Sequence, residues 1–366
     1  MPALRLPGLA IVTILAIAAC APVSASTGAA STGAASTGAA STGGTERIAA
    51  TALPAAGTRP GYAPYVETWL SGTLPAIGRA SGARNLTLAF LQTARTGSCT
   101  LTWDGDASLA VTGKHYAGQI HAVRKAGGSV IPSFGGAVAD GDGTDIADSC
   151  ASVPAIAADY ESVIRIYRVT ALDMDVESSS LTNRAGLTRR SEALALLQQW
   201  AARTHRRVRI YVTLPVTPAG LTAADQTVLT SARSHGVQVA AVNIMAFDYF
   251  QGTAVVNMAA AAIGALRSTH AQLARLYTRL SPARIWQLQA ITLLPGVDDD
   301  PAKNEVTSLA NAAAVLAYAR SHSVGRISVW ALQRDNGGCP GTPDSNTCSG
   351  INQPRWAFSR LLETGS

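Results

Sequence analysis

From about residue 60 onward, short apolar segments alternate with longer amphipathic ones. Eight of the short segments are rich in Val, Ile, Leu and aromatic residues, which is typical of β-strands. These predicted strands are 63–70, 85–93, 129–136, 168–177, 207–215, 239–249, 286–296 and 326–334. Helical periodicity lies between them, over 191–205, 223–235, 258–277 and 308–322. Eight strands in alternation with helices predict a parallel sheet, and eight is the number that closes into a single (β/α)8 TIM barrel.

A doubly wound open sheet is the alternative α/β arrangement of these elements. It would lead us to expect a glycine-rich phosphate-binding loop after the first strand, and none is found there. The length of 366 residues fits one barrel, and a hydrophobic content of 47% suffices for its core. The net charge of +6 comes mostly from arginines that are scattered along the sequence, so we expect no nucleic-acid partner.

The first 59 residues differ in composition from the predicted barrel. Residues 1–20 carry the apolar run LPGLAIVTILAIAAC, which is short for a membrane span and indicates a secretory signal. Its end resembles a bacterial lipobox, in which the cysteine, here Cys20, is lipidated; an ordinary signal peptide cut after APVSA is the alternative. Residues 21–59 contain STGAA repeats and predict a flexible linker. We therefore expect an exported chain, either a cell-surface lipoprotein or secreted, whose folded domain covers 60–366.

Four cysteines remain after Cys20, and in an exported chain they predict disulfide bonds. The short spacing favours a bond between Cys339 and Cys348, which leaves Cys99 to pair with Cys150. No group of histidines and cysteines has the spacing of a zinc site. We expect neither a metal ion nor a cofactor.

The segment LDMDVE (172–177) alternates apolar and acidic residues with the period of a β-strand. A solvated edge strand could carry this pattern, but a closed barrel has no such edge. The carboxyl groups of Asp173, Asp175 and Glu177 are therefore predicted to point into the lumen, with Glu177 at the C-terminal rim, where barrel enzymes place their chemistry. Because like charges this close resist full ionisation, at least one of the three should hold a proton at neutral pH. A neutral acid at the rim suits general acid catalysis.

The same segment resembles the signature strand of glycoside hydrolase family 18, the chitinase family, usually written DGxDxDxE. Three more motifs occur in the family's order. SFGG at 133–136 resembles the SxGG motif of the third strand, and VNIMAFDY at 242–249 resembles the MxYD motif of the sixth. VWALQRDN at 329–336 is similar to the last strand, whose Trp lies under the bound sugar. The resemblance covers roughly residues 62–362 and implies a TIM barrel that hydrolyses β-1,4-linked N-acetylglucosamine.

The resemblance also implies roles for individual residues in substrate-assisted retaining hydrolysis. Glu177 would be the general acid and base, Asp175 would orient the acetamido group of the substrate, and Asp173 would share a proton with Asp175. The implied substrate-binding and pocket-forming residues are Asp248, Met245, Phe247, Tyr249, Trp330, Ser133 and Gly135. Trp103 is a further candidate for stacking against sugar, because it follows the second predicted strand near the rim.

Two positions depart from the family's motifs. Thr170 and Ala171 stand where the signature has Asp and Gly, which should have a modest effect. Phe247 stands where many members have a tyrosine whose hydroxyl helps to hold the acetamido group. Losing such a donor costs about 1–3 kcal/mol where its buried partner is left unpaired, and Tyr249 is a candidate to compensate.

Three functions are consistent with these residues. The leading one is a chitinase, acting as a monomer on chitin or chito-oligosaccharides. A chito-oligosaccharide-binding, lectin-like barrel with weak or no hydrolysis is the first alternative. An endo-β-N-acetylglucosaminidase acting on glycan cores is the second. Since no separate chitin-binding module is visible, we expect soluble or amorphous substrates rather than crystalline fibre.

Overall fold

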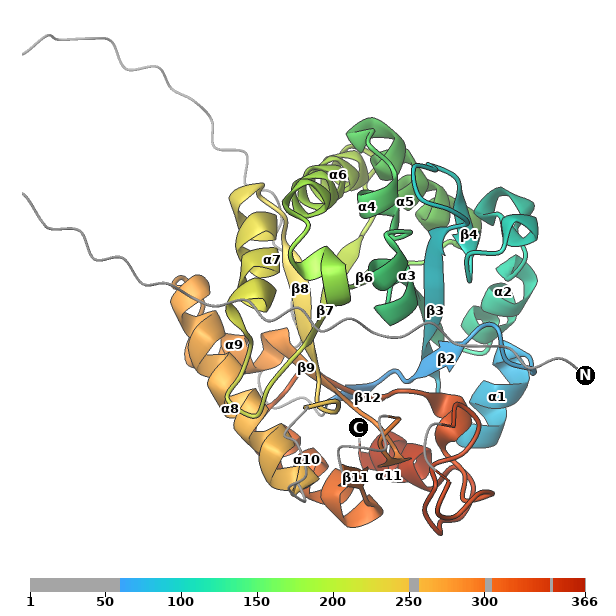
Figure 1. Cartoon of the computed structure of the whole chain (residues 1–366), viewed down its shortest axis with the longest axis vertical. Helices are drawn as coiled ribbons and strands as arrows, with labels where there is room; N and C mark the ends of the chain where they lie inside the picture. Colours follow the sequence, from blue (N-terminus) through green and yellow to red (C-terminus); the bar gives the residue numbers. More distant parts are fainter. Residues whose placement is uncertain (1–59, 250–256, 300–304, 343–344, 366) are drawn as a thin grey trace, which may run out of the picture. The chain divides into compact units, whose positions relative to one another are not determined.

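A closed parallel sheet forms the centre of the fold in the computed structural model, with helices around it (Figure 1). The structure describes residues 60–249, 257–299, 305–342 and 345–365. The strands are β1 Gly61–Tyr62, β2 Tyr65–Glu67, β3 Asn85–Thr93, β4 Leu101–Trp103, β5 Ser129–Gly135, β6 Ala171–Asp175, β7 Arg209–Pro215, β8 Val239–Met245, β9 Gln289–Leu293, β10 Gly296–Val297, β11 Val306–Thr307 and β12 Arg326–Val329.

The order of strands around the sheet is β1-β12-β9-β8-β7-β6-β5-β3-β2. β1 pairs in parallel with β12, and β2 pairs in parallel with β3. Only Ala63 and Pro64 separate β1 from β2, so these two short strands act as one barrel strand that joins the two ends of the sheet. The predicted TIM barrel is thereby confirmed, and the open doubly wound sheet is excluded.

The helices lie between successive strands along the chain, except for α11, which follows the last strand. They are α1 Leu74–Ser81, α2 Ala117–Lys125, α3 Ala137–Asp142, α4 Ile146–Ser149, α5 Val153–Tyr167, α6 Arg184–Arg203, α7 Ala223–Ser234, α8 Met258–Leu276, α9 Pro282–Leu288, α10 Leu309–His322 and α11 Ala357–Gly365. The predicted strand 286–296 begins too early, because residues up to Leu288 belong to α9. Ser281 caps that helix by accepting a hydrogen bond from the N–H of Arg284, and Pro282 fits its first turn.

The alternation in β6 separates two environments, as the sequence predicts. Leu172, Met174 and Val176 point outward and join the main core beneath the helices. On the lumen side, small and aromatic residues that include Ala171 and Tyr211 fill the N-terminal end of the barrel. The acidic side chains of β6 lie above that plug, towards the carboxyl ends of the strands.

Both predicted disulfides, Cys99–Cys150 and Cys339–Cys348, are present. The signal segment predicted over 1–20 and the linker predicted over 21–59 lie outside the described residues. Within the described part of the chain, none of the helices combines the length and the apolar composition needed to cross a bilayer.

Candidate active site

A cavity of about 370 Å³ opens at the carboxyl ends of the barrel strands. Several of its lining residues end a strand: Glu67 ends β2, Gly135 ends β5, Asp175 ends β6 and Met245 ends β8. Glu177, two residues beyond β6, also lines it. Because a barrel brings the carboxyl ends of all its strands to one rim, residues far apart in the sequence meet here.

Asp173 lies below the cavity and is held by three hydroxyl groups. Tyr65 Oη and Ser133 Oγ donate to its Oδ2 at 2.8 and 2.7 Å, and Thr213 Oγ1 donates to its Oδ1 at 2.8 Å. Asn243 Nδ2 in turn donates to the hydroxyls of Tyr65 and Thr213, at 3.3 and 3.1 Å. These bonds fix the carboxyl group of Asp173 in one position.

Asp175 is 3% exposed, and its Oδ1 has no hydrogen-bond partner among the described residues. Burial holds the pKa of this carboxyl well above its ordinary value. The charges of Glu177, Asp173 and Asp140 raise this pKa further. The carboxyl of Asp175 therefore keeps its proton to a higher pH than an ordinary aspartate does.

Glu177 stands at the rim of the cavity. Burial raises the pKa of its carboxyl to about 7, although a hydrogen bond from the backbone N–H of Ala137 lowers it. The charge of Asp299 adds to the increase in this pKa. The backbone N–H of Glu177 donates to Oδ2 of Asp140, which fixes the chain at this point. A carboxyl with a pKa near neutrality can both give and take a proton at physiological pH.

The SFGG segment brings β5 close to these acids. The register of β5 and β6 places Ser133 opposite Asp173 and Gly135 opposite Asp175. Gly135 has a φ of +88°, and a Cβ there would lie 2.1 Å from the backbone oxygen of Asp175. Only glycine therefore fits this approach of the two strands.

Aromatic side chains form one wall of the cavity. Phe90 and Trp330 stack with ring centroids 5.3 Å apart and planes at 22°. Trp69 stacks on Phe90 at 6.3 Å and 26°, and Tyr65 meets Trp330 edge-on at 5.6 Å. Since Trp69 is 45% exposed, this flat apolar wall extends from the cavity to solvent.

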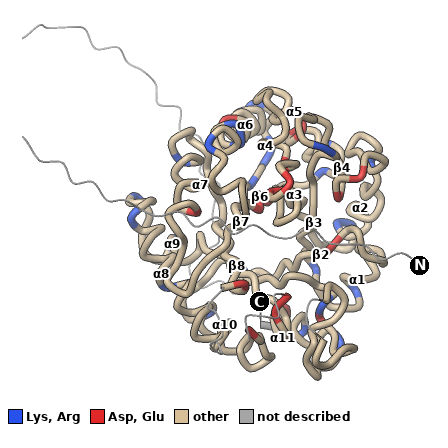
Figure 2. Tube along the Cα trace, in the orientation of Figure 1, with Lys and Arg blue, Asp and Glu red and all other residues tan. Residues whose placement is uncertain are grey.

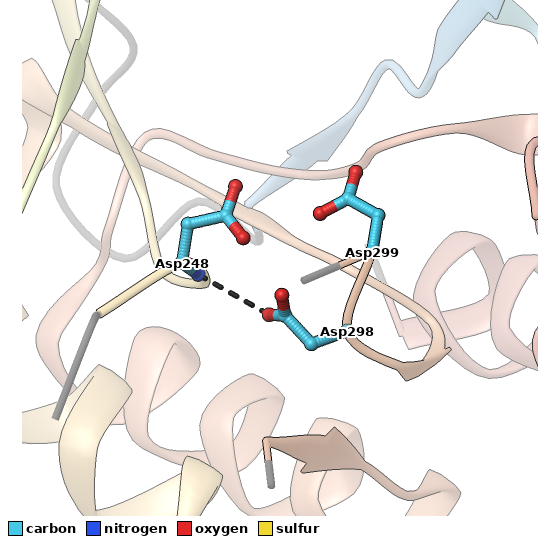
Figure 3. Close-up of side chains that lie close together, drawn as sticks. All are labelled: Asp248, Asp298 and Asp299. Carbon is cyan, nitrogen blue, oxygen red and sulfur yellow. Dashed lines mark hydrogen bonds between the residues drawn. The ribbon is translucent and has the colours of Figure 1, made fainter. Parts of the chain in front are cut away.

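Three carboxyls, those of Asp248, Asp298 and Asp299, lie close together (Figure 3), and Asp248 and Asp299 also line the cavity. The backbone N–H of Asp248 donates to Oδ2 of Asp298 at 3.3 Å, and oxygens of all three residues lie within 4.8 Å of one another. Burial, together with the neighbouring Asp298 and Asp299, raises the pKa of Asp248 to about 10. Asp248 is therefore a neutral hydrogen-bond donor at physiological pH.

Among the described residues, these three carboxyls are the group whose spacing fits a metal ion. The proton on Asp248 removes one negative charge from the group. The charges of Asp298 and Asp299 act on the neighbouring guanidinium of Arg334, whose pKa burial lowers. The proton on Asp248 and the guanidinium of Arg334 both reduce the repulsion among these carboxyls.

Comparisons with known proteins agree with this geometry. A protein of Escherichia coli K12 described as a probable bifunctional chitinase/lysozyme is 30% identical over 82% of this chain and 34% of its own length. Endochitinase 11 of Metarhizium anisopliae is 30% identical over 75% of this chain and 52% of its own length. The chain thus spans about half, or less, of the length of these curated relatives. No protein-family model matches the chain.

Among solved structures, catalytic-site mutants of active domain 2 of a chitinase from Pyrococcus furiosus superpose with a TM-score of 0.72. The identity is 27%, and the match covers 85% of this chain and 96% of that chain. The chain belongs to glycoside hydrolase family 18. The same Pyrococcus domain has also been solved in complex with chito-oligosaccharides, with a TM-score of 0.72.

Most of the residues implied by the family resemblance line the cavity. They are Glu177, Asp175, Asp248, Met245, Phe247, Gly135 and Trp330. Asp173 and Ser133 lie beneath it and bond to each other, so Ser133 supports the site rather than lining it. Thr170, where the family 18 signature has its first Asp, is exposed at the far end of β6.

Two implied substrate contacts are wrong. Trp103 is fully buried, and its Nε1 donates to Oη of Tyr167 at 2.8 Å, so it packs in the core instead of stacking on sugar. Tyr249 is buried outside the cavity, with its backbone N–H donating to Oε2 of Glu305 at 3.1 Å.

Several acidic residues of the site were not among those predicted from the sequence. Glu67 lines the cavity, is 1% exposed, and neither of its carboxyl oxygens has a hydrogen-bond partner among the described residues. Glu67 lies two residues after Tyr65 in the predicted strand 63–70, so the strand period could have placed both side chains on the same face. Asp140 and Asp299 belong to loops and a short helix, where no strand period points them to the cavity.

Proposed function

We propose that this protein is a chitinase that hydrolyses β-1,4-linked N-acetylglucosamine by substrate-assisted retaining catalysis. The observation that carries the proposal is the pairing of Glu177 with Asp175. One acid has a pKa near neutrality at the rim, and the other presents an unpartnered carboxyl oxygen beside it. The names of the relatives, which are chitinases, support the same substrate class.

In the first step, the carboxyl proton of Glu177 passes to the glycosidic oxygen as the bond to the anomeric carbon breaks. The carbonyl oxygen of the substrate's acetamido group attacks that carbon, which gives an oxazolinium ion. Oδ1 of Asp175 is available to accept the acetamido N–H, so the group is held for attack. Asp173 is held by its three hydroxyl partners, and its charge favours the protonated form of Asp175.

In the second step, a water molecule adds to the anomeric carbon and the oxazolinium ring opens. The carboxylate of Glu177 takes a proton from this water and is ready for another cycle. Asp248, as a neutral acid, can donate a hydrogen bond to the same sugar. Trp330, backed by Phe90, offers a flat face for the apolar side of the ring.

We also propose that the chain is exported, is lipidated at Cys20, and acts as a monomer. The apolar run that ends in IAAC and the two disulfides of the barrel support export. Metabolic labelling with a fatty-acid analogue, with Cys20→Ser as the control, tests the lipid. Label retained by the Cys20→Ser variant would refute it.

The catalytic proposal is tested by the release of nitrophenol from nitrophenyl chito-oligosaccharides of several lengths. Wild type should cleave them, and Glu177→Gln should lose at least a thousandfold in kcat while it still binds chito-oligosaccharides. Binding without cleavage by the wild type would indicate a lectin-like barrel and would implicate Phe247. Cleavage of a glycoprotein core with no cleavage of chitin oligomers would indicate an endo-β-N-acetylglucosaminidase.

A further inference from the structure

A second hollow, of about 570 Å³, lies at the end of the barrel opposite the cavity. It is bounded by the C-terminal ends of α2 and α5 and by the segments that lead into β6 and β7. Five arginines line it: Arg124, Arg165, Arg168, Arg206 and Arg207. We call this surface the arginine hollow. Residues that are scattered along the sequence are thus gathered by the fold.

Little negative charge balances the arginine hollow. Glu161 pairs with Arg165 at 3.0 Å, and the guanidiniums of Arg165 and Arg206 lie over the ring of Trp200 at 5.0 and 5.5 Å. Within the described part of the chain, the other three guanidiniums have no hydrogen bond, ion pair or ring contact. All five arginines are exposed.

The acidic residues gather elsewhere. Figure 2 shows Asp and Glu near α3, β6 and β8. The cavity at the other end of the barrel is lined by six acidic residues, which are Glu67, Asp104, Asp175, Glu177, Asp248 and Asp299, and by no lysine or arginine among the described residues. The two ends of the barrel therefore differ in charge, although the sequence shows no basic block. Such an asymmetry directs a negatively charged partner to one face.

Helix stability explains only part of the clustering. A basic residue in the last turn of a helix interacts favourably with the helix dipole, which accounts for Arg124 in α2 and Arg165 in α5. Arg206 and Arg207 lie beyond the end of α6, in the turn before β7. Arg206 gains a contact with the ring of Trp200, but Arg207 has no such partner among the described residues, and the two positions bring like charges together. A ligand that carries several phosphate groups would relieve this repulsion, since the guanidinium fork matches phosphate oxygens.

We propose that the arginine hollow is a docking surface for the phosphate headgroups of an anionic membrane. The path of the chain favours a membrane over other phosphate-bearing partners. Gly61 of β1 is paired with Arg326, the first residue of β12, and its N–H donates to the oxygen of Gly325 at 3.0 Å. The chain therefore enters the barrel at the same end as the arginine hollow.

The point at which the chain enters the barrel bears on how the cavity is oriented relative to the membrane. The linker predicted over 21–59 joins the barrel at the end that carries the arginine hollow, so the lipid proposed at Cys20, on which this step rests, would attach the barrel to the bilayer through that end. Headgroups bound in the hollow would then fix the orientation of the barrel. The cavity, at the carboxyl ends of the strands, would face away from the membrane and stay open to large substrates.

The test is co-sedimentation of the full chain, with Cys20→Ser in every protein, with vesicles of phosphatidylcholine alone or with one quarter phosphatidylglycerol. The variant Arg124→Gln/Arg168→Gln/Arg207→Gln removes three charges from the hollow and leaves Trp200 and its stacked arginines in place. The matched control, Arg95→Gln/Arg184→Gln/Arg355→Gln, removes three exposed charges outside it. None of these residues lines the cavity, so hydrolysis of soluble oligosaccharides should be unchanged in both variants.

Each charge at an anionic surface contributes about fivefold to binding, so the hollow variant should bind the anionic vesicles about a hundredfold more weakly than wild type at low salt. The control variant should stay within about threefold of wild type, and binding to neutral vesicles should not differ among the three. Equal losses in both variants would attribute binding to net charge and overturn the proposal. If low-millimolar inorganic phosphate competes with the vesicles, the hollow binds a soluble phosphate instead. If the protein binds RNA but not vesicles, the hollow binds nucleic acid. Either result would overturn a membrane role.

Discussion

The buried carboxyl of Glu67 should make the barrel less stable as the pH rises, and Glu67→Gln should remove this effect. The side chain is 1% exposed, neither oxygen has a described hydrogen-bond partner, and burial raises its pKa to about 8. The charge of Arg334 lowers this pKa and that of Asp299 raises it, but burial is the largest cause. Glutamine has the same shape and stays neutral at every pH.

The direction in which stability changes with pH follows from the protons that the folded and unfolded states bind. Between the unfolded pKa of about 4.5 and the folded value of about 8, the folded protein keeps a proton that the unfolded chain releases. The favourable contribution present below pH 4.5 is therefore lost as the pH rises, at up to about 1.4 kcal/mol per pH unit. At pH 7 the wild type should be less stable than Glu67→Gln by about 3 kcal/mol, relative to the difference at pH 4.5.

Urea unfolding of both proteins at half-unit steps from pH 4.5 to 8 measures this difference. The exposed Glu192→Gln on α6 is the matched control, since it removes the same charge without a buried carboxyl. The difference between wild type and Glu67→Gln should grow with pH, while that for Glu192→Gln should stay nearly flat. A difference for Glu67→Gln that does not change between pH 5 and 8 would refute the argument that this carboxyl is protonated in the folded state.

Four further results follow from the site and the disulfides. kcat/KM should fall above about pH 7 as Glu177 loses its proton, and a profile that is flat to pH 9 would contradict its role as the acid. Phe247→Tyr returns a hydroxyl to the cavity wall and should raise kcat/KM about fivefold or more; no gain would mean that this wall does not meet the acetamido group. Ser133→Ala removes one of three donors to Asp173 and should cost about 1–3 kcal/mol of unfolding free energy, whereas a loss below about 0.5 kcal/mol would show the bond to be unimportant. Replacing Cys99 and Cys150 by Ser opens a loop of 51 residues and should cost about 4 kcal/mol; a protein of unchanged stability would contradict this estimate from chain entropy.

The barrel and the centre of the site could be predicted because their signals are local. Strands such as 85–93 and 207–215 are marked by their own apolar residues, and the alternation in LDMDVE assigns each side chain to the helix side or the lumen. The first barrel strand was harder to delimit. It is made of two short pieces, β1 and β2, and only β2 lies within the predicted segment 63–70.

Features that depend on distant contacts could not be predicted in this way. Trp103 follows a strand near the rim, but its Nε1 finds Tyr167, 64 residues away, and the side chain turns into the core. Asp140 reaches the site through a bond to the backbone of Glu177, 37 residues away. The arginine hollow likewise draws on α2, α5 and the turn before β7, which no window of the sequence contains together.

The protonation of a few buried carboxyls affects both the proposed catalysis and the stability of this barrel. Burial raises the pKa of Glu67 to about 8, that of Glu177 to about 7, and those of Asp140 and Asp175 well above the ordinary range. Each of these groups loses a favourable contribution to folding as the pH rises through its raised pKa, and the general acid is lost in the same direction. In the proposed mechanism Glu177 keeps its catalytic proton up to about pH 7, whereas the stability that depends on this proton already falls above the ordinary pKa of about 4.5. A substitution that lowers these pKa values by admitting water to the cavity should therefore shift the upper pH limit of activity downward and should reduce the loss of stability at high pH.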